Sequence, residues 1–219
     1  MVKVKICGIT NVEDALEAVA YGADAVGFLV GQVYPSRSAF ISAEAAARIA
    51  AKLPPFCSTV LVTHLSRPSA VVRAARTARV TTIQLHGETQ PDEAAAIRRS
   101  LPYVKVYKAV HVLGEAAVAQ ARRFVGKVDG IVLDTASKET GQVGGTGKPH
   151  DWAISQRIVQ AVPLPVILAG GLTPENVRRA IRLVQPYAVD VNSGVSRPDG
   201  SKDRLKLRRF IQRAKMSHI

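Results

Sequence analysis

Two residues whose side chains can transfer protons lie at the ends of short apolar runs. Cys7 closes the run 4–7, and Asp134 follows the run 130–133. A thiolate can act as a base, and a carboxyl group can act as an acid. Alternatively, Cys7 is a small side chain packed in the core, and Asp134 caps the backbone at the start of a loop.

Lys5 lies two residues before Cys7, so a strand would place both side chains on one face. A nearby ammonium lowers the pKa of a thiol and favours its thiolate. Equally, Lys5 could be the partner of a buried carboxylate. Asp190 lies inside the apolar run 187–191, where an unpaired charge is costly, and could reach Lys5, Cys7 or a ligand amine.

Two histidines also end apolar runs. His86 follows Gln84 and Leu85, and His64 follows Thr63; each could serve as an acid or base, or orient a loop through hydrogen bonds. Neither the histidines and carboxylates nor the two cysteines, Cys7 and Cys57, have metal-ligand spacing. We therefore expect no metal.

Glycine-rich turns follow the last two apolar runs. Gly170 and Gly171 come after the run 165–168, and Ser193 and Gly194 come after the run 187–191. Backbone N–H groups in such turns hold phosphate in many enzymes with parallel sheets. A third glycine cluster, 144–148, lacks the spacing of a phosphate-binding loop and is predicted to be a loop that closes over a substrate.

Short β-branched runs alternate with helical patterns along the whole chain, which predicts βαβ units and a parallel sheet. Eight such units predict one (β/α)8 TIM barrel over residues 1–219, with an open doubly wound sheet as the alternative. Ser42, and Thr173 followed by Pro174, are typical helix starts. The expected strands are 4–7, 25–30, 58–62, 82–85, 104–109, 130–133, 165–168 and 187–191; the expected helices lie near 11–21, 43–53, 67–78, 91–100, 114–125, 151–162, 174–184 and 202–215.

The composition is 47% hydrophobic and 21% charged, as in globular proteins, with no membrane-spanning run. Two cysteines do not make a disulfide framework, so we expect the cytoplasm. The net charge of +13 is concentrated at the end, where residues 197–219 contain eight Lys or Arg. Leucines and Phe210 in this tail favour a docked helix with a basic face, and we expect attraction of anionic metabolites rather than nucleic acid binding.

Taken together, these motifs resemble the phosphoribosylanthranilate isomerase family. They occur in family order over nearly the whole chain: VKICGIT (4–10), GADAVGF (22–28), QLHG (84–87), LDT (133–135), GGTGK (144–148) through Asp151 and Trp152, LAGGLTPEN (168–176) and VDVNSG (189–194).

The resemblance implies an Amadori rearrangement of a phosphorylated substrate without metal or redox cofactor. In that reaction Asp134 is the general acid that protonates the ribose ring oxygen, and Cys7 is the base that removes the C2 proton. The resemblance also places Asp190 at the anthranilate amine and His86 in the substrate site. By the same resemblance, Gly170, Gly171, Ser193 and Gly194 would bind the phosphate.

Three positions depart from the family pattern. Ala39 stands where an arginine usually binds the substrate carboxylate, and Arg37, two residues away, is expected to replace it. The ending of the run near 58–62, usually close to Val-Phe-Val-Asn, is Val60-Leu-Val-Thr63-His64 here, and Ser196 replaces a common glutamate. Two alternatives therefore stay open: a family member that acts on another sugar phosphate, and a non-catalytic protein associated with nucleic acid. The sequence does not indicate the oligomeric state.

Overall fold

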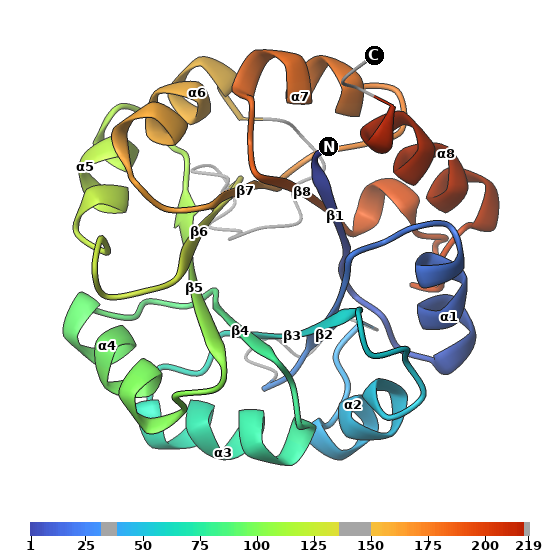
Figure 1. Cartoon of the computed structure of the whole chain (residues 1–219), viewed down its shortest axis with the longest axis horizontal. Helices are drawn as coiled ribbons and strands as arrows, with labels where there is room; N and C mark the ends of the chain where they lie inside the picture. The colour runs from blue at the N-terminus through green and yellow to red at the C-terminus, as the bar shows by residue number, and fades with distance from the viewer. Residues whose placement is uncertain (32–38, 136–149, 217–219) are drawn as a thin grey trace.

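The structure, a computed structural model, describes residues 1–31, 39–135 and 150–216. The described strands form a closed barrel in the order β1 to β8, and every neighbouring pair is parallel (Figure 1). The predicted (β/α)8 barrel is confirmed. The strands are β1 (Lys3–Ile6), β2 (Ala25–Leu29), β3 (Ser58–Thr63), β4 (Thr82–Leu85), β5 (Lys105–His111), β6 (Gly130–Asp134), β7 (Val166–Leu168) and β8 (Ala188–Val191).

Helices surround the barrel as an outer ring (Figure 1). Each expected helix is present, and a short 3₁₀ turn, η1 (Ser193–Val195), follows β8. The α-helices are α1 (Val12–Ala20), α2 (Ala43–Ala50), α3 (Pro68–Ala78), α4 (Pro91–Ser100), α5 (Ala116–Arg122), α6 (Trp152–Ala161), α7 (Val177–Val184) and α8 (Arg204–Lys215).

Local chemistry explains where the helices begin. Ser42 caps α2 as predicted, because its Oγ accepts the Ala45 N–H at 3.1 Å. The prediction that α7 begins at Pro174 is wrong, although Thr173, the predicted cap, accepts the Glu175 N–H at its Oγ1 at 3.2 Å. A turn that includes Asn176 intervenes, and the helix begins only at Val177.

The hydrophobic core lies mainly between the barrel and its helices. Ile6, Phe28 and Leu133 are fully buried there. Burial on both faces explains why the strands are continuous apolar runs. Inside the barrel, Gly27 leaves room for the side chains of Cys7 and Lys5, because a Cβ at this position would lie 3.0 Å from Cys7 Sγ and from Lys5 Cε.

The basic C-terminal segment docks as α8. Leu207, Phe210 and Ile211 are buried against the barrel, whereas the basic positions of this helix are largely exposed. Leu205 is exposed and does not join the core. No helix formed by the described residues is both long and apolar enough to cross a membrane.

Candidate active site

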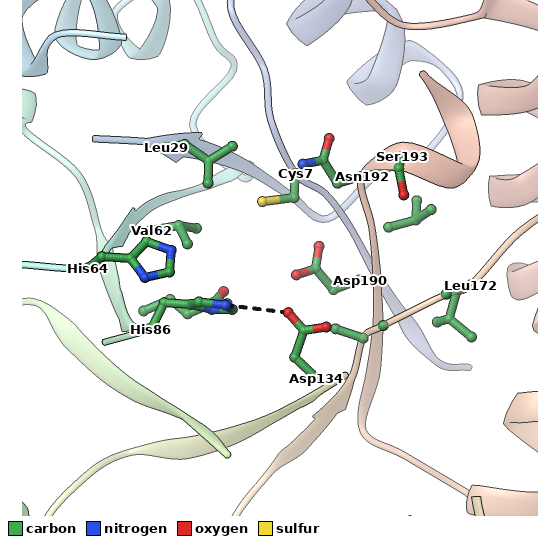
Figure 2. A pocket seen from close by; sticks show the side chains of 15 residues that line it. Cys7, Leu29, Val62, His64, His86, Asp134, Leu172, Asp190, Asn192 and Ser193 are labelled. Atoms are coloured by element: carbon green, nitrogen blue, oxygen red, sulfur yellow. Dashed lines mark hydrogen bonds and ion pairs between the residues drawn. The ribbon is translucent and has the colours of Figure 1, made fainter. Parts of the chain in front are cut away.

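A pocket opens where the strands end (Figure 2). Its wall comes from residues in or directly after β1, β2, β3, β4, β6, β7 and β8, as expected for the C-terminal face of such a barrel. The pocket brings together predicted site residues that are up to 186 positions apart in the chain, from 7 to 193. They are Cys7, His86, Asp134, Gly170, Gly171, Asp190 and Ser193.

Lys5 and Asp190 form a buried ion pair below the pocket. The register of β1 and β8 places the two residues opposite each other. Lys5 Nζ donates a hydrogen bond to Asp190 Oδ2 at 2.6 Å, and both side chains are more than nine-tenths buried. The alternative that Lys5 pairs with a carboxylate is therefore correct. The second oxygen, Asp190 Oδ1, is buried and has no hydrogen-bond partner among the described residues.

The pKa of the Cys7 thiol is raised above its usual value. Burial is the largest cause, the Lys5 charge opposes it, and the Asp190 carboxylate adds to the increase. The expected effect of Lys5 on this thiol is present, but the net shift of the pKa is upward. Lys5 acts in the expected direction, but the carboxylate beside it offsets its charge and burial disfavours the thiolate.

Asp134 uses its two carboxylate oxygens differently. Oδ1 accepts the Thr135 backbone N–H at 2.7 Å, so the expected capping contact is present. Oδ2 lies 3.6 Å from His86 Nε2, and the side chain faces the pocket (Figure 2). Capping thus orients the carboxyl group and leaves one oxygen directed at the pocket and at His86.

His86 is held between two other imidazoles. Its ring centroid lies 4.6 Å from that of His64 and 5.2 Å from that of His111, both at steep interplanar angles. Burial, followed by the charges of His64 and His111, lowers the pKa of His86 well below its usual value. The ring is therefore neutral at pH 7.

A neutral imidazole has one donor and one acceptor nitrogen. Gln84 Nε2 lies 3.5 Å from His86 Nδ1, on the opposite side of the ring from Asp134. His86 Nε2 can accordingly donate to an ionised carboxylate or accept from a protonated one, depending on the tautomer. Such a partner suits a carboxyl group that changes its protonation state during a reaction.

The sequence reasoning missed His111. The expected strand ends at 109, whereas β5 extends to His111, which pairs in register with Asp134. The alternation of Tyr107, Ala109 and His111 along one strand face would have revealed it. Burial lowers the pKa of His111 to about 4, and the charges of Lys108 and His64 add to the decrease.

The loop after β7 has the conformation expected of an anion-binding turn. Gly170 and Gly171 have φ values of +76° and +66°, and a Cβ at Gly170 would lie 2.2 Å from Thr135 Oγ1. Asn176 fastens the loop, because its Oδ1 accepts the Thr173 N–H and its Nδ2 donates to the Gly171 carbonyl. Ser193 begins η1 on the neighbouring loop and also lines the pocket.

Two predicted site residues are not brought to the pocket by the described structure. Gly194 does not line it; a Cβ there would lie 2.0 Å from the Leu172 carbonyl oxygen, so this glycine lets the loops after β7 and β8 pack together. Arg37 lies outside the described residues, as does the glycine cluster 144–148.

The site combines a thiol and carboxyl groups with the turns that contain Gly170, Gly171 and Ser193. Cys7 and Asp134 lie on different walls, Asp190 lies between them, and the glycine loops close the side formed by β7 and β8 (Figure 2). Among the described residues, no three His, Cys, Asp or Glu side chains are placed to hold a metal ion. This arrangement can move protons on a small phosphorylated molecule.

Comparison with known proteins agrees with the site. A family model described as N-(5'-phosphoribosyl)anthranilate isomerase matches residues 4–213. N-(5'-phosphoribosyl)anthranilate isomerase 2 of Methanosarcina mazei is 43% identical over 97% of this chain and 94% of its own length. The isomerase of Methanocella arvoryzae is 44% identical over 99% of this chain and 100% of its own length.

Solved structures show the same relationship. The phosphoribosylanthranilate isomerase of Thermotoga maritima has a TM-score of 0.83 and 42% identity, covering 98% of this chain and 99% of its own. A structure of such an isomerase in complex with reduced 1-(o-carboxyphenylamino)-1-deoxyribulose 5-phosphate has a TM-score of 0.82 and 39% identity, with 98% and 99% coverage. With a matching family model and relatives over its whole length, this chain belongs to the N-(5'-phosphoribosyl)anthranilate isomerase family.

Proposed function

We propose that this chain converts N-(5'-phosphoribosyl)anthranilate to 1-(2-carboxyphenylamino)-1-deoxyribulose 5-phosphate in tryptophan biosynthesis, with Asp134 as general acid and Cys7 as general base. Family membership supports the reaction. The observation that carries the residue roles is the placement of Cys7 and Asp134 on different walls of the pocket, with Asp190 between them (Figure 2).

The reaction begins with opening of the ribose ring. The protonated Asp134 carboxyl group gives its proton to the ring oxygen, and the bond between that oxygen and C1 breaks. The lone pair of the anthranilate nitrogen forms a C1=N bond, which leaves an iminium cation. Asp134 ends this step as a carboxylate, which His86 Nε2, 3.6 Å away, can stabilise by donating a hydrogen bond.

Isomerisation then requires removal of the C2 proton. The Cys7 thiolate accepts it, and the electrons of the C2–H bond form a C1=C2 bond while the iminium nitrogen is neutralised. The resulting enolamine tautomerises to the ketone when the 2-hydroxyl loses its proton and C1 gains one. The substrate gains one proton from Asp134 and loses one to Cys7, so the product is an isomer; release of the Cys7 proton to solvent and uptake of one by Asp134 restore both groups for the next turnover.

The remaining pocket groups account for recognition. Asp190 Oδ1 is a buried acceptor without a partner among the described residues, and an N–H of the anthranilate amine would satisfy it. Backbone N–H groups of the loops containing Gly170, Gly171 and Ser193 would hold the phosphate. Arg37 remains our candidate for the anthranilate carboxylate.

A second candidate is isomerisation of another sugar phosphate by the same acid and base. The observation that favours it is the end of β3, where Thr63 and His64 depart from the usual family ending and His64 lines the pocket. Cytoplasmic location and the lack of a nucleic acid partner stay predictions from composition.

The test combines an assay and a complementation experiment. Purified protein should consume N-(5'-phosphoribosyl)anthranilate, followed by the change in fluorescence of the anthranilate group, and should restore growth of a tryptophan auxotroph that lacks the isomerase. Soluble expression without turnover or rescue would overturn the proposed substrate. Turnover of a different phosphorylated N-glycoside by the same preparation would then favour the second candidate.

A further inference from the structure

If Cys7 is a thiolate, its negative charge and that of Asp190 are matched by only one positive charge, that of Lys5. Cys7 must be a thiolate to accept a proton, yet burial raises the pKa of this thiol. Lys5 is the strongest influence that lowers this pKa, but its ammonium is shared with Asp190, 2.6 Å away, whose carboxylate acts in the opposite direction, and burial still outweighs it. A base at this position needs another positive group nearby.

Lys202 is such a group. It lies between η1 and α8 in the chain and is only 1% exposed. Its Nζ donates to Asn192 Oδ1 and to Ser196 Oγ, each at 2.9 Å, and both acceptors are neutral. Within the described part of the chain, Lys202 Nζ forms no ion pair with a carboxylate. A buried ammonium without a countercharge is costly and calls for a functional reason.

Contacts through Asn192 connect this ammonium to Cys7. A Cβ at Gly8, the residue after Cys7, would lie 2.4 Å from Asn192 Oδ1, the oxygen that accepts the bond from Lys202. The Cys7 backbone N–H donates to the Val191 carbonyl at 2.8 Å, which places Cys7 beside the end of β8, where Asn192 follows directly. Figure 2 shows the two side chains together on one wall of the pocket.

We propose that Lys202 is a positioning residue for the reaction: its ammonium, held behind Asn192, supplies the positive charge that stabilises the Cys7 thiolate. Loss of the Cys7 proton then leaves two ammonium groups, one carboxylate and one thiolate among Lys5, Lys202, Asp190 and Cys7, and these four formal charges sum to zero; the part-buried Asp14 carboxylate, which accepts the Lys202 backbone N–H at 3.0 Å, lies outside this set. The inference rests on the proposed role of Cys7 as base.

The electrostatics around Lys202 agree with this arrangement. Burial lowers the pKa of Lys202 to about 8, while Cys7, Asp14 and Asp190 raise it and Lys5 lowers it further. The ammonium is therefore mostly charged at pH 7. In return, the charge of Lys202 lowers the pKa of Cys7.

Ser196 gives the Lys202 ammonium a neutral neighbour in this chain. The family pattern commonly has glutamate at this position, and here a neutral hydroxyl lies 2.9 Å from Lys202 Nζ. A carboxylate in place of this hydroxyl would pair with Lys202 and cancel the charge that faces Cys7. The position therefore offers a test that leaves Lys202 itself in place.

The experiment measures the pKa of Cys7 directly, from the pH dependence of its alkylation by iodoacetamide in a Cys57→Ser background. Lys202→Met should raise the alkylation pKa by about one unit, in line with loss of a nearby opposite charge. Ser196→Glu should raise it as well, whereas Ser196→Gln, which introduces a side chain of the same size as glutamate but without charge, should leave it unchanged.

Equal alkylation pKa values for the Ser196→Glu and Ser196→Gln variants would overturn the proposal even if Lys202→Met does not fold. The measurement does not depend on turnover. If the variants shift the alkylation pKa of Cys7 but the parent protein has no isomerase activity, the role of Lys202 is supported and the proposed function is contradicted. If the parent protein is an active isomerase but the variants leave the alkylation pKa unchanged, the proposed function is supported and the role of Lys202 is contradicted.

Discussion

Lys5 Nζ lies 2.6 Å from Asp190 Oδ2 across the seam where β8 meets β1 and the barrel closes. Burial opposes the charge of Lys5, but Asp190 and Cys7 together outweigh it and hold the pKa of Lys5 above its usual value. The pair thus joins the first and last strands and fixes Asp190 beside the pocket, where its second oxygen has no hydrogen-bond partner within the described ranges of the chain.

Breaking this pair should destabilise the fold. Lys5→Met or Asp190→Leu alone leaves a buried charge without its partner, and we expect each to lower the free energy of unfolding by about 3–5 kcal/mol. The double variant should lose clearly less than the sum of the two, as measured by urea denaturation. Strict additivity would mean that the two side chains do not interact.

The thiol of Cys7 can be tested against the other cysteine. Cys7→Ser should reduce kcat by about 10²–10⁴-fold, because a hydroxyl at this position is a much weaker base than a thiolate. Cys57, which lies just before β3 and whose pKa burial raises to about 11, serves as the control. Cys57→Ser should retain activity, and equal losses for the two variants would argue against a special role for Cys7.

Replacement of the acid should separate chemistry from binding. Asp134→Asn keeps the side-chain shape and removes the transferable proton, so kcat should fall by about 10²–10⁴-fold. Binding of the reduced product analogue, followed by isothermal titration calorimetry, should change little by comparison. As a control, Asp92→Asn alters a carboxylate in an exposed pair with Lys127 and should leave kcat unaffected. Near-normal turnover by Asp134→Asn would remove this residue from the mechanism.

Two glycines with the same backbone conformation provide a matched test of the phosphate loop. Gly170 and Gly126 both have φ of +76°, but a Cβ would collide with Thr135 Oγ1 only at Gly170. Both alanine variants should lose about 1 kcal/mol or more of stability from backbone strain. Only Gly170→Ala should also lower kcat/KM, by at least about tenfold, which is about 1.4 kcal/mol of lost transition-state binding. Similar kcat/KM values for the two variants would count against a phosphate site at Gly170.

The buried imidazole of His111 predicts how stability depends on pH. Its pKa is lowered from 6.5 to about 4, so between these values the unfolded chain binds a proton that the folded protein does not. Stability should therefore fall as the pH decreases below 6.5, and His111 should contribute at most about 2 kcal/mol of the loss between pH 7.5 and 5. His111→Phe should flatten the pH dependence of the urea midpoint; an unchanged slope would show that His111 is protonated equally in both states.

Much of this protein follows from local patterns. The alternation of apolar runs and helical segments predicts the closed barrel, because a strand buried on both faces and a helix with one apolar face each need the other. The same patterns place Cys7 and Asp134 at the ends of their strands and Asp190 within the last strand. The fold rules then direct all three to one mouth of the barrel, where the structure places them.

The tertiary structure decided how the charges are shared. The sequence allowed Lys5 to activate Cys7 or to pair with a carboxylate, and the strand register selected Asp190 as its partner. It also brought Lys202, from a basic tail with no distinguishing pattern, to the wall behind Cys7. Burial and distances between residues far apart in the chain set these balances, and neither can be read from the spacing of residue types. Cys7 and Asp134 could thus be proposed from the sequence, but the charges that control Cys7 required the folded barrel.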